Sequence, residues 1–115
     1  MKIAEKKINT ESKLLYIKGR LDVHLVDQIE PIILDELATT EIKNLAIDIS
    51  EVSYLGSSGI KLFLYLNQKT KSKNGSLVLV KITSSNKRLL DAMGIGEFFE
   101  YANSENEVVE LFTNA

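Results

Sequence analysis

The chain has 115 residues, of which 44% are apolar and 26% charged, with one proline and no cysteine. This composition is that of an ordinary globular chain, and the length suits one compact domain over residues 1–115. The net charge of -2 argues against nucleic acid as a partner, and the lack of cysteine excludes disulfides and thiolate metal sites. No apolar run is long enough for a signal peptide or a membrane span. We therefore expect a cytoplasmic protein without direct membrane insertion.

The first part of the chain predicts two strands and a helix. Residues 2–9 and 13–19 have strand patterns and are close enough to form a hairpin. Apolar residues recur at helical spacing over residues 23–37, and Asp22 can cap the start of that helix. Pro31 predicts a kink or a later helix start, because an interior proline loses a backbone hydrogen bond and clashes with the previous turn.

The rest of the chain continues the alternation of strands and helices. It predicts a buried strand at residues 43–49, a central helix at 58–73 and a strand at 76–82. A helix that ends at Met93, a short strand at 98–101 and a last helix at 104–112 follow. Ser84 or Ser85 can cap the helix that ends at Met93, and Gly94 can terminate it. The pattern predicts an α/β fold with a mostly parallel or mixed sheet of four to five strands and about four helices.

Two adjacent serines, Ser57 and Ser58, stand between the buried strand and the central helix, with Gly56 and Gly59 on either side. Backbone N–H groups and the positive end of a helix dipole beside a hydroxyl suit a group that carries, or avoids carrying, a phosphate. A purely local interpretation is also open, in which Ser57 is an N-cap and Ser58 a small residue in a tight turn.

Four segments, in order, resemble the STAS domain (sulphate transporter and anti-sigma factor antagonist), and in particular the bacterial anti-sigma factor antagonists. These are Asp-Ile-Ser-x-Val-x-Tyr-Leu-x-Ser-Ser-Gly at residues 48–59, Ile-Lys-Gly-Arg-Leu-Asp at 17–22, the strand at 75–80 and the helix with its glycine end at 86–95. Together they cover nearly the whole chain.

The resemblance implies a regulatory binding protein without catalytic activity. Family members of this kind are phosphorylated by a kinase that is also the anti-sigma factor; the unphosphorylated form captures that kinase and so frees a sigma factor. The family's phosphoacceptor is the second hydroxyl residue before the glycine, which is Ser58 here, with Ser57 as the second choice. A serine/threonine kinase and a phosphatase are therefore the expected partners.

One position departs from the family pattern. Anti-sigma factor antagonists usually carry aspartate immediately before the two hydroxyl residues, whereas this chain has Gly56. An acidic group there could order the turn or help to position the hydroxyl for the kinase. The alternative function is a STAS subunit or scaffold, not phosphorylated, of a membrane transporter or signalling complex.

A helical wheel over residues 59–73 separates two apolar groups. The first, expected in the core, consists of Gly59, Leu62, Phe63, Leu66 and Thr70. Ile60 and Leu64 lie to one side, with Asn67 and Lys71, and form a candidate docking surface; alternatively, they pack under the helix that ends at Met93. The full set of expected partner-binding residues is Asp22, Gly56, Ser57, Ser58, Gly59, Ile60, Lys61 and Leu64.

Two aspartates could add an acidic pocket beside Ser58. Asp22 and Asp48 both follow strand patterns, although Asp22 could simply cap a helix and Asp48 could order a turn through Ser50. His24, the only histidine, is expected to be exposed.

Lysines at positions 69, 71 and 73 form either a basic patch or the solvated end of a helix, which is where cations complement the helix dipole. We expect no cofactor and no metal, because a lone histidine cannot build a metal site. We do not expect an enzyme, because the sequence shows no paired general acid and base and no phosphate-binding loop. The glycines of Gly94-Ile-Gly96 lack the preceding strand, the following helix and the third glycine of a nucleotide-binding fingerprint. A monomer or a weak dimer fits the composition.

Overall fold

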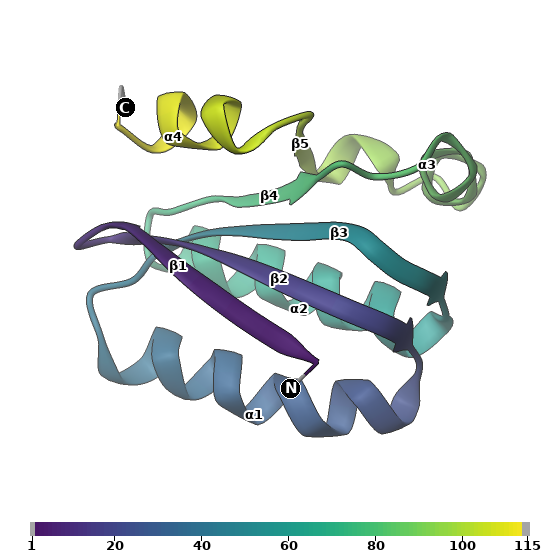
Figure 1. The fold of residues 1–115 in the computed structure, drawn as a ribbon, viewed down its shortest axis with the longest axis horizontal. Coiled ribbons are helices and arrows are strands. Elements are labelled where there is room, and N and C mark those ends of the chain that lie inside the picture. The colour runs from purple at the N-terminus through teal and green to yellow at the C-terminus, as the bar shows by residue number, and fades with distance from the viewer. Residues whose placement is uncertain (1, 114–115) are drawn as a thin grey trace.

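The computed structural model describes residues 2–113, and its centre is a mixed five-stranded sheet with helices on both faces (Figure 1). In chain order the elements are β1 (Ile3–Asn9), β2 (Ser12–Leu21), α1 (Val23–Thr39), β3 (Asn44–Leu55), α2 (Ser57–Ser72), β4 (Leu77–Val80), α3 (Ser84–Ala92), the 3-10 helix η1 (Gly96–Phe98), β5 (Glu100–Ala102) and α4 (Glu105–Thr113). The predicted α/β fold is confirmed. Residues 1, 114 and 115 of the expected domain lie outside the described part.

The strands lie in the sheet in the same order as in the chain, β1-β2-β3-β4-β5. The first two form the expected antiparallel hairpin, and every later pair is parallel. Each parallel connection runs through a helix, which returns the chain to the end of the sheet where the next strand begins. The carboxyl ends of β2 and β3 therefore lie at one edge of the sheet, where α1 and α2 begin (Figure 1).

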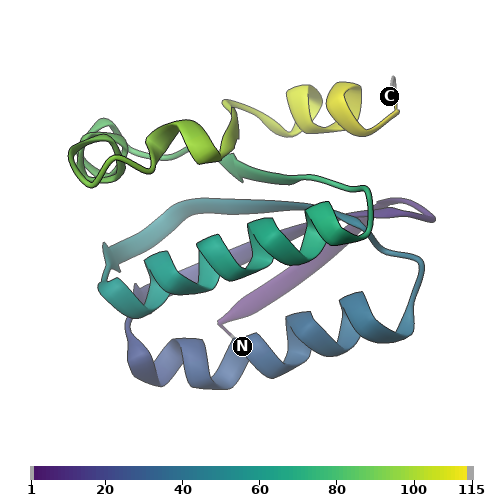
Figure 2. The ribbon, with the colours of Figure 1, turned by 180° about the vertical axis from the view of Figure 1, so that it is seen from behind.

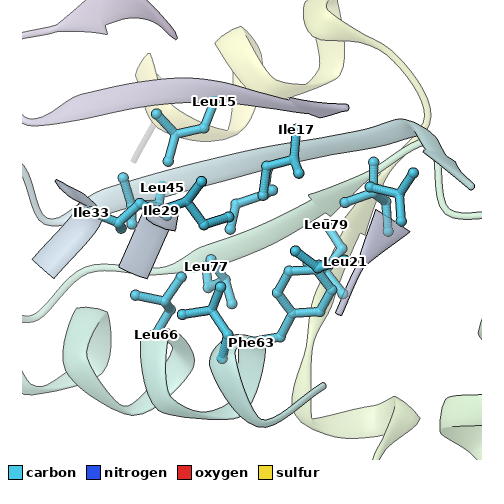
Figure 3. Close-up of a cluster of buried hydrophobic side chains, with 14 of the residues drawn as sticks. Leu15, Ile17, Leu21, Ile29, Ile33, Leu45, Phe63, Leu66, Leu77 and Leu79 are labelled. Carbon is cyan, nitrogen blue, oxygen red and sulfur yellow. The ribbon is translucent and has the colours of Figure 1, made fainter. Parts of the chain in front are cut away.

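The sheet is covered on both faces, which explains the continuous apolar runs in its parallel strands. Helices α1 and α2 cover one face, as Figure 2 shows from behind, and α4 packs on the other with Val108 and Phe112. The larger core cluster, between the sheet and α1 and α2, contains Leu15, Ile17, Leu21, Ile29, Ile33, Leu45, Phe63, Leu66, Leu77 and Leu79 among others (Figure 3). The residues predicted for the core stripe of α2 are all buried, which confirms that part of the helical wheel.

Strand β3 is six residues longer at its end than predicted, because it runs to Leu55 rather than ending at 49. Its register against β2 shifts twice: between Tyr16 and Lys18 the partner residue moves from Asp48 to Glu51, and a second shift follows Gly19. These β-bulges add unpaired residues and bend the strand. They also break the regular alternation that marks a strand, so the sequence pattern past residue 49 resembles a turn.

Helix α1 begins at Val23, where its apolar spacing begins, and it runs through Pro31, so the alternative of a later start is wrong. Helix α3 is capped by Thr83, whose Oγ1 accepts from the Asn86 N–H at 3.1 Å, rather than by Ser84 or Ser85. Three consecutive hydroxyl residues offer equivalent caps, and the local pattern does not distinguish them.

The chain between α3 and β5 is also more structured than predicted. Gly94 has φ 75° and terminates the helix as expected. Phe98, however, belongs to η1, and β5 occupies residues 100–102 rather than 98–101. The short helical turn precedes the strand because Phe98 N–H bonds to the Ile95 carbonyl at 3.0 Å.

Candidate functional site

The two serines lie in the first turn of α2, at the carboxyl end of the sheet. Ser57 is the first helical residue and is exposed, and Ser58 is half-buried. The alternative interpretation of Ser57 as an N-cap is wrong, because the cap position is Gly56, which has no side chain to cap the helix. The Ile60 N–H closes the first turn on the Gly56 carbonyl at 3.1 Å. The first N–H groups of α2 therefore have no partner within the helix.

Gly56 is held to the sheet and covered by an aromatic ring. Its N–H donates to the Leu21 carbonyl at 3.2 Å, which joins the start of α2 to the end of β2. A Cβ at this position would lie 2.8 Å from Cε2 and 3.1 Å from the hydroxyl oxygen of Tyr54. An aspartate, the usual family residue, could enter only if the Tyr54 ring moved. With glycine at this position, the Tyr54 ring can lie directly over the start of α2.

The guanidinium of Arg20 lies over the Tyr54 ring, 4.3 Å from its centroid, and makes a cation–π contact with it. Arg20 Nε is also 3.9 Å from Asp22 Oδ2, across an exposed surface. Sequence analysis missed both Arg20 and Tyr54. They are direct partners in the β2–β3 register only because of the two bulges, and the hydrophobic pattern of the sequence does not predict a bulge.

Asp22 has the structural role that was left open for it. Its Oδ1 accepts from the Leu25 N–H at 3.1 Å and so caps α1. This backbone hydrogen bond is the main reason that the pKa of Asp22 is lowered, with smaller help from His24 and Arg20. Since the neighbouring Leu21 carbonyl is bonded to Gly56, Asp22 lies at the same end of the sheet as the serines.

Asp48 does not join this site, so the expected acidic pocket of two aspartates is wrong. The carboxylate accepts from the N–H and the hydroxyl of Ser50, at 2.9 and 2.7 Å, and lies 3.6 Å from Lys81 Nζ. Because β3 continues from there to Leu55, Asp48 is in mid-strand. The alternative, that it orders the backbone through Ser50, is correct, although what it orders is a bulge rather than a turn.

Gly59 allows α2 to approach the sheet closely. A Cβ there would lie 2.8 Å from Leu21 Cγ and 3.0 Å from Leu55 Cδ1. Both leucines are buried at the ends of their strands. The glycine after the serines is therefore explained by packing, and its contribution to a partner surface is indirect.

The side of α2 predicted as a docking surface is largely covered. Ile60 is only 5% exposed and belongs to the core cluster, so its expected exposure is wrong, and Leu64 is half-buried against the same cluster. Asn67 donates to the Phe98 carbonyl at 3.0 Å, so η1 lies along this side of the helix. Lys61 is exposed and His24 is exposed as expected.

The lysines at the end of α2 do not form a single basic patch. Lys73 Nζ donates to the carbonyls of Leu37, Thr40 and Ile42 and so caps the end of α1 and the loop after it. Lys69 lies over the Tyr65 ring, 5.5 Å from its centroid. The three lysines are therefore better interpreted as the residues of an ordinary helix end than as a basic patch.

Two hydroxyls, those of Ser57 and Ser58, lie in the first turn of α2. The two aspartates considered above bond to Leu25 and Ser50, not to Ser57 or Ser58. Within residues 2–113, no group of three or more histidine, cysteine, aspartate or glutamate side chains is placed to hold a metal ion. None of the helices in that range has the length and apolar character needed to cross a bilayer. An exposed hydroxyl at a helix N-terminus can receive a phosphate from another enzyme, and the helix dipole would stabilise it.

Comparison with known proteins gives consistent matches. The family model of the STAS domain matches residues 4–108. An anti-sigma-B factor antagonist of Listeria monocytogenes is 25% identical over 106 residues, which cover 90% of each chain. The fold is shared with the anti-sigma factor antagonist SpoIIAA in its unphosphorylated form, at TM-score 0.85 and 18% identity over 98% of this chain and 97% of that one. The phosphorylated form of the Bacillus protein SpoIIAA aligns at TM-score 0.78 and 19% identity, over 96% and 98% of the two chains.

Proposed function

Because the chain belongs to the STAS domain family, we propose that it is an anti-sigma factor antagonist switched by phosphorylation of Ser58. In its unphosphorylated form it captures an anti-sigma factor that is also a serine/threonine kinase, and so frees a sigma factor in the cytoplasm. The observation that carries the proposal is the position of two serine hydroxyls, one exposed and one half-buried, in the first turn of a helix that has no side-chain cap. The names of the relatives add support, since they include antagonists and a phosphorylated form.

The switch would act on the surface rather than on the fold. A phosphate adds about -1.5 to -2 charges, and at a helix N-terminus this charge is stabilised by the dipole. The domain therefore stays folded while the new charge repels the partner. A phosphatase then restores the binding form.

The partner surface that we propose is smaller than the sequence suggested. It contains the exposed or half-buried residues Asp22, Ser57, Ser58 and Lys61, with Leu64 at its margin. The buried residues Gly56, Gly59 and Ile60 shape it from below. We add Arg20 and Tyr54, since exposed tyrosine and arginine side chains are the residue types that most often dominate binding energy.

The test is peptide mass spectrometry of the protein isolated from its native cells during growth and stress. We expect one phosphate on Ser58 that differs between the two states, and loss of phosphate in Ser58→Ala but not in the matched variant Ser72→Ala. The kinase should co-purify with Ser58→Ala and not with Ser58→Asp. Unmodified Ser58 in both states, with other phosphopeptides recovered, would exclude the switch.

That result would favour the second candidate, a STAS subunit or scaffold of a transporter or signalling complex that is not phosphorylated. The observation in its favour is that Tyr54, rather than an acidic side chain, lies over residue 56. A constitutive complex that does not change between Ser58→Ala and Ser58→Asp would then be expected.

A further inference from the structure

A pocket of about 130 Å³ lies between the edge strand β1 and helix α1, under the hairpin. Its walls are the aliphatic side chains of Ile3, Leu15, Ile33 and Leu45. Ile32 of α1, which is 49% exposed, also lines the pocket. The pocket shares no residue with the serine site, and the functions proposed above do not use it.

The pocket exists because charged residues occupy positions where the strands face the core. Glu5 is paired with Leu15 in the hairpin register, so both lie on the face that α1 covers. Lys13 lies on the same face two residues before Leu15. Neither Glu5 nor Lys13 supplies a branched aliphatic side chain to fill the space against α1.

Glu5, Lys13 and Glu36 form a charged triad in the lining of the pocket. Lys13 is 8% exposed, its ammonium donates to Glu36 Oε1, and it lies 3.3 Å from Glu5 Oε1. Burial lowers the pKa of Lys13, but the hydrogen bonds to Glu36 and Glu5 outweigh it and the pKa is raised. The triad thus contains two carboxylates and one ammonium, with a net charge of -1.

We propose that this pocket binds a small hydrocarbon group that carries a primary ammonium. The volume is close to the roughly 150 Å³ of apolar cavities that take up benzene, which sets the size of the hydrocarbon part. The surplus carboxylate charge beside Lys13 pairs with the ammonium. The same surplus charge disfavours an anionic head group.

The first experiment is ¹³C-methyl NMR of the full chain titrated with benzylammonium chloride, with toluene and sodium benzoate as matched probes. The expected result is a saturable shift of the Leu15, Ile33 and Leu45 methyl signals in the millimolar range with benzylammonium. Toluene, which lacks the charge, should bind several-fold more weakly, and benzoate should produce no saturable shift. Val78 methyls, which lie in the other core cluster, serve as the internal control.

Variants test the two parts of the pocket separately. Glu36→Gln, and in case it unfolds the more exposed Glu5→Gln, should remove the preference for benzylammonium over toluene. Ile32→Trp should close the pocket to both probes, while Val109→Trp, at an exposed apolar position on α4, should change neither.

Three outcomes would overturn the proposal. The first is the absence of a saturable shift with any probe, and the second is an equal response at Val78. The third is benzoate or toluene binding as tightly as benzylammonium, which would deny the carboxylates their role. The proposal does not depend on phosphorylation of Ser58, so it can fail or hold independently of the switch.

Discussion

The two ends of helix α2 are built in opposite ways. At the carboxyl end, the Gly75 N–H bonds to the Thr70 carbonyl at 2.8 Å, and Lys73 satisfies three carbonyls of α1 and its following loop. At the amino end, Gly56 provides no side-chain cap and Ser57 is exposed. One helix thus has its polar groups paired at the end that is joined to α1, and no side-chain cap at the end that bears the serines.

The carboxyl end also contains the tightest backbone contact. A Cβ at Gly75 would lie 1.8 Å from the Lys43 carbonyl oxygen, which belongs to the backbone and cannot move aside alone. At the amino end, the atoms that crowd Gly56 and Gly59 belong to side chains. Substitutions should therefore have effects that decrease from one end of α2 to the other.

The largest effect is expected for Gly75→Ala. The new methyl collides with backbone, so the free energy of unfolding should fall by about 3 kcal/mol, as for severe overpacking. Urea unfolding followed by circular dichroism measures it. Gly94→Ala is the control for backbone conformation, because φ is 75° there but the space is open, and it should lose about 1 kcal/mol. Equal losses of stability in the two variants would contradict a collision with the backbone at Gly75.

Gly59→Ala should have the next largest effect. Its methyl meets Leu21 and Leu55, whose side chains can shift, so a loss of about 2 kcal/mol in the free energy of unfolding is expected. Gly56→Ala should lose less, because Tyr54 is 44% exposed and its ring can swing away. A larger loss at Gly56 in the same urea experiment would show that Tyr54 is fixed.

Lys73→Met tests the polar contacts at the carboxyl end. Removal of the ammonium leaves three carbonyls of α1 and its loop without their donor, and a loss of about 1 kcal/mol is expected from hydrogen bonds of this kind. Lys71→Met, at an exposed position of the same helix, should change the melting temperature little. If both variants behave alike, Lys73 is an ordinary surface lysine.

Ser58→Asp should raise stability slightly, by about 0.5 kcal/mol, because a negative charge at a helix N-terminus complements the dipole. Ser72→Asp, at the last residue of α2, should lower it by a similar amount. Thermal melts at low and high salt check both, and the two effects should shrink in high salt. A destabilised Ser58→Asp would contradict a switch that leaves the fold intact.

The smallest effect concerns the exposed cap of α1. The hydrogen bond from Leu25 lowers the pKa of Asp22 below its ordinary value of 3.8, so the charged cap stabilises the fold above that value. This contribution is lost as the pH falls through the lower, folded-state pKa. Asp22→Asn keeps a capping oxygen without titrating, so its melting temperature should fall less than that of the wild type between about pH 5 and pH 2.5. Identical pH profiles would contradict the role of the charge.

Much of the fold was predictable because local patterns agree with it. The apolar recurrence in α2 identified its core residues, and Asp22 was correctly named as a cap. What could not be predicted depends on contacts between strands. The bulges of β3 place Tyr54 beside Arg20, and neither bulge has a sequence signal.

The candidate site was predictable in its position but not in its surroundings. Ser57 and Ser58 lie at a helix start as the sequence indicated. A helical wheel places Ile60 to one side of the core stripe, but a wheel contains no information on which other parts of the chain cover that side, and Ile60 is buried. Gly56 could be recognised as a departure from the family pattern, but the Tyr54 ring that lies over it is visible only in three dimensions.

The agreement between strand order and chain order has a consequence for how the molecule is made. A chain that emerges from the ribosome with its N-terminus first can add each strand to one that is already present, without waiting for a distant segment. The antiparallel hairpin β1–β2 is the natural template, and α1 with β3 follow it. The serine-bearing start of α2 would then leave the ribosome before β4 and β5, so vectorial synthesis and assembly of the sheet proceed in the same direction.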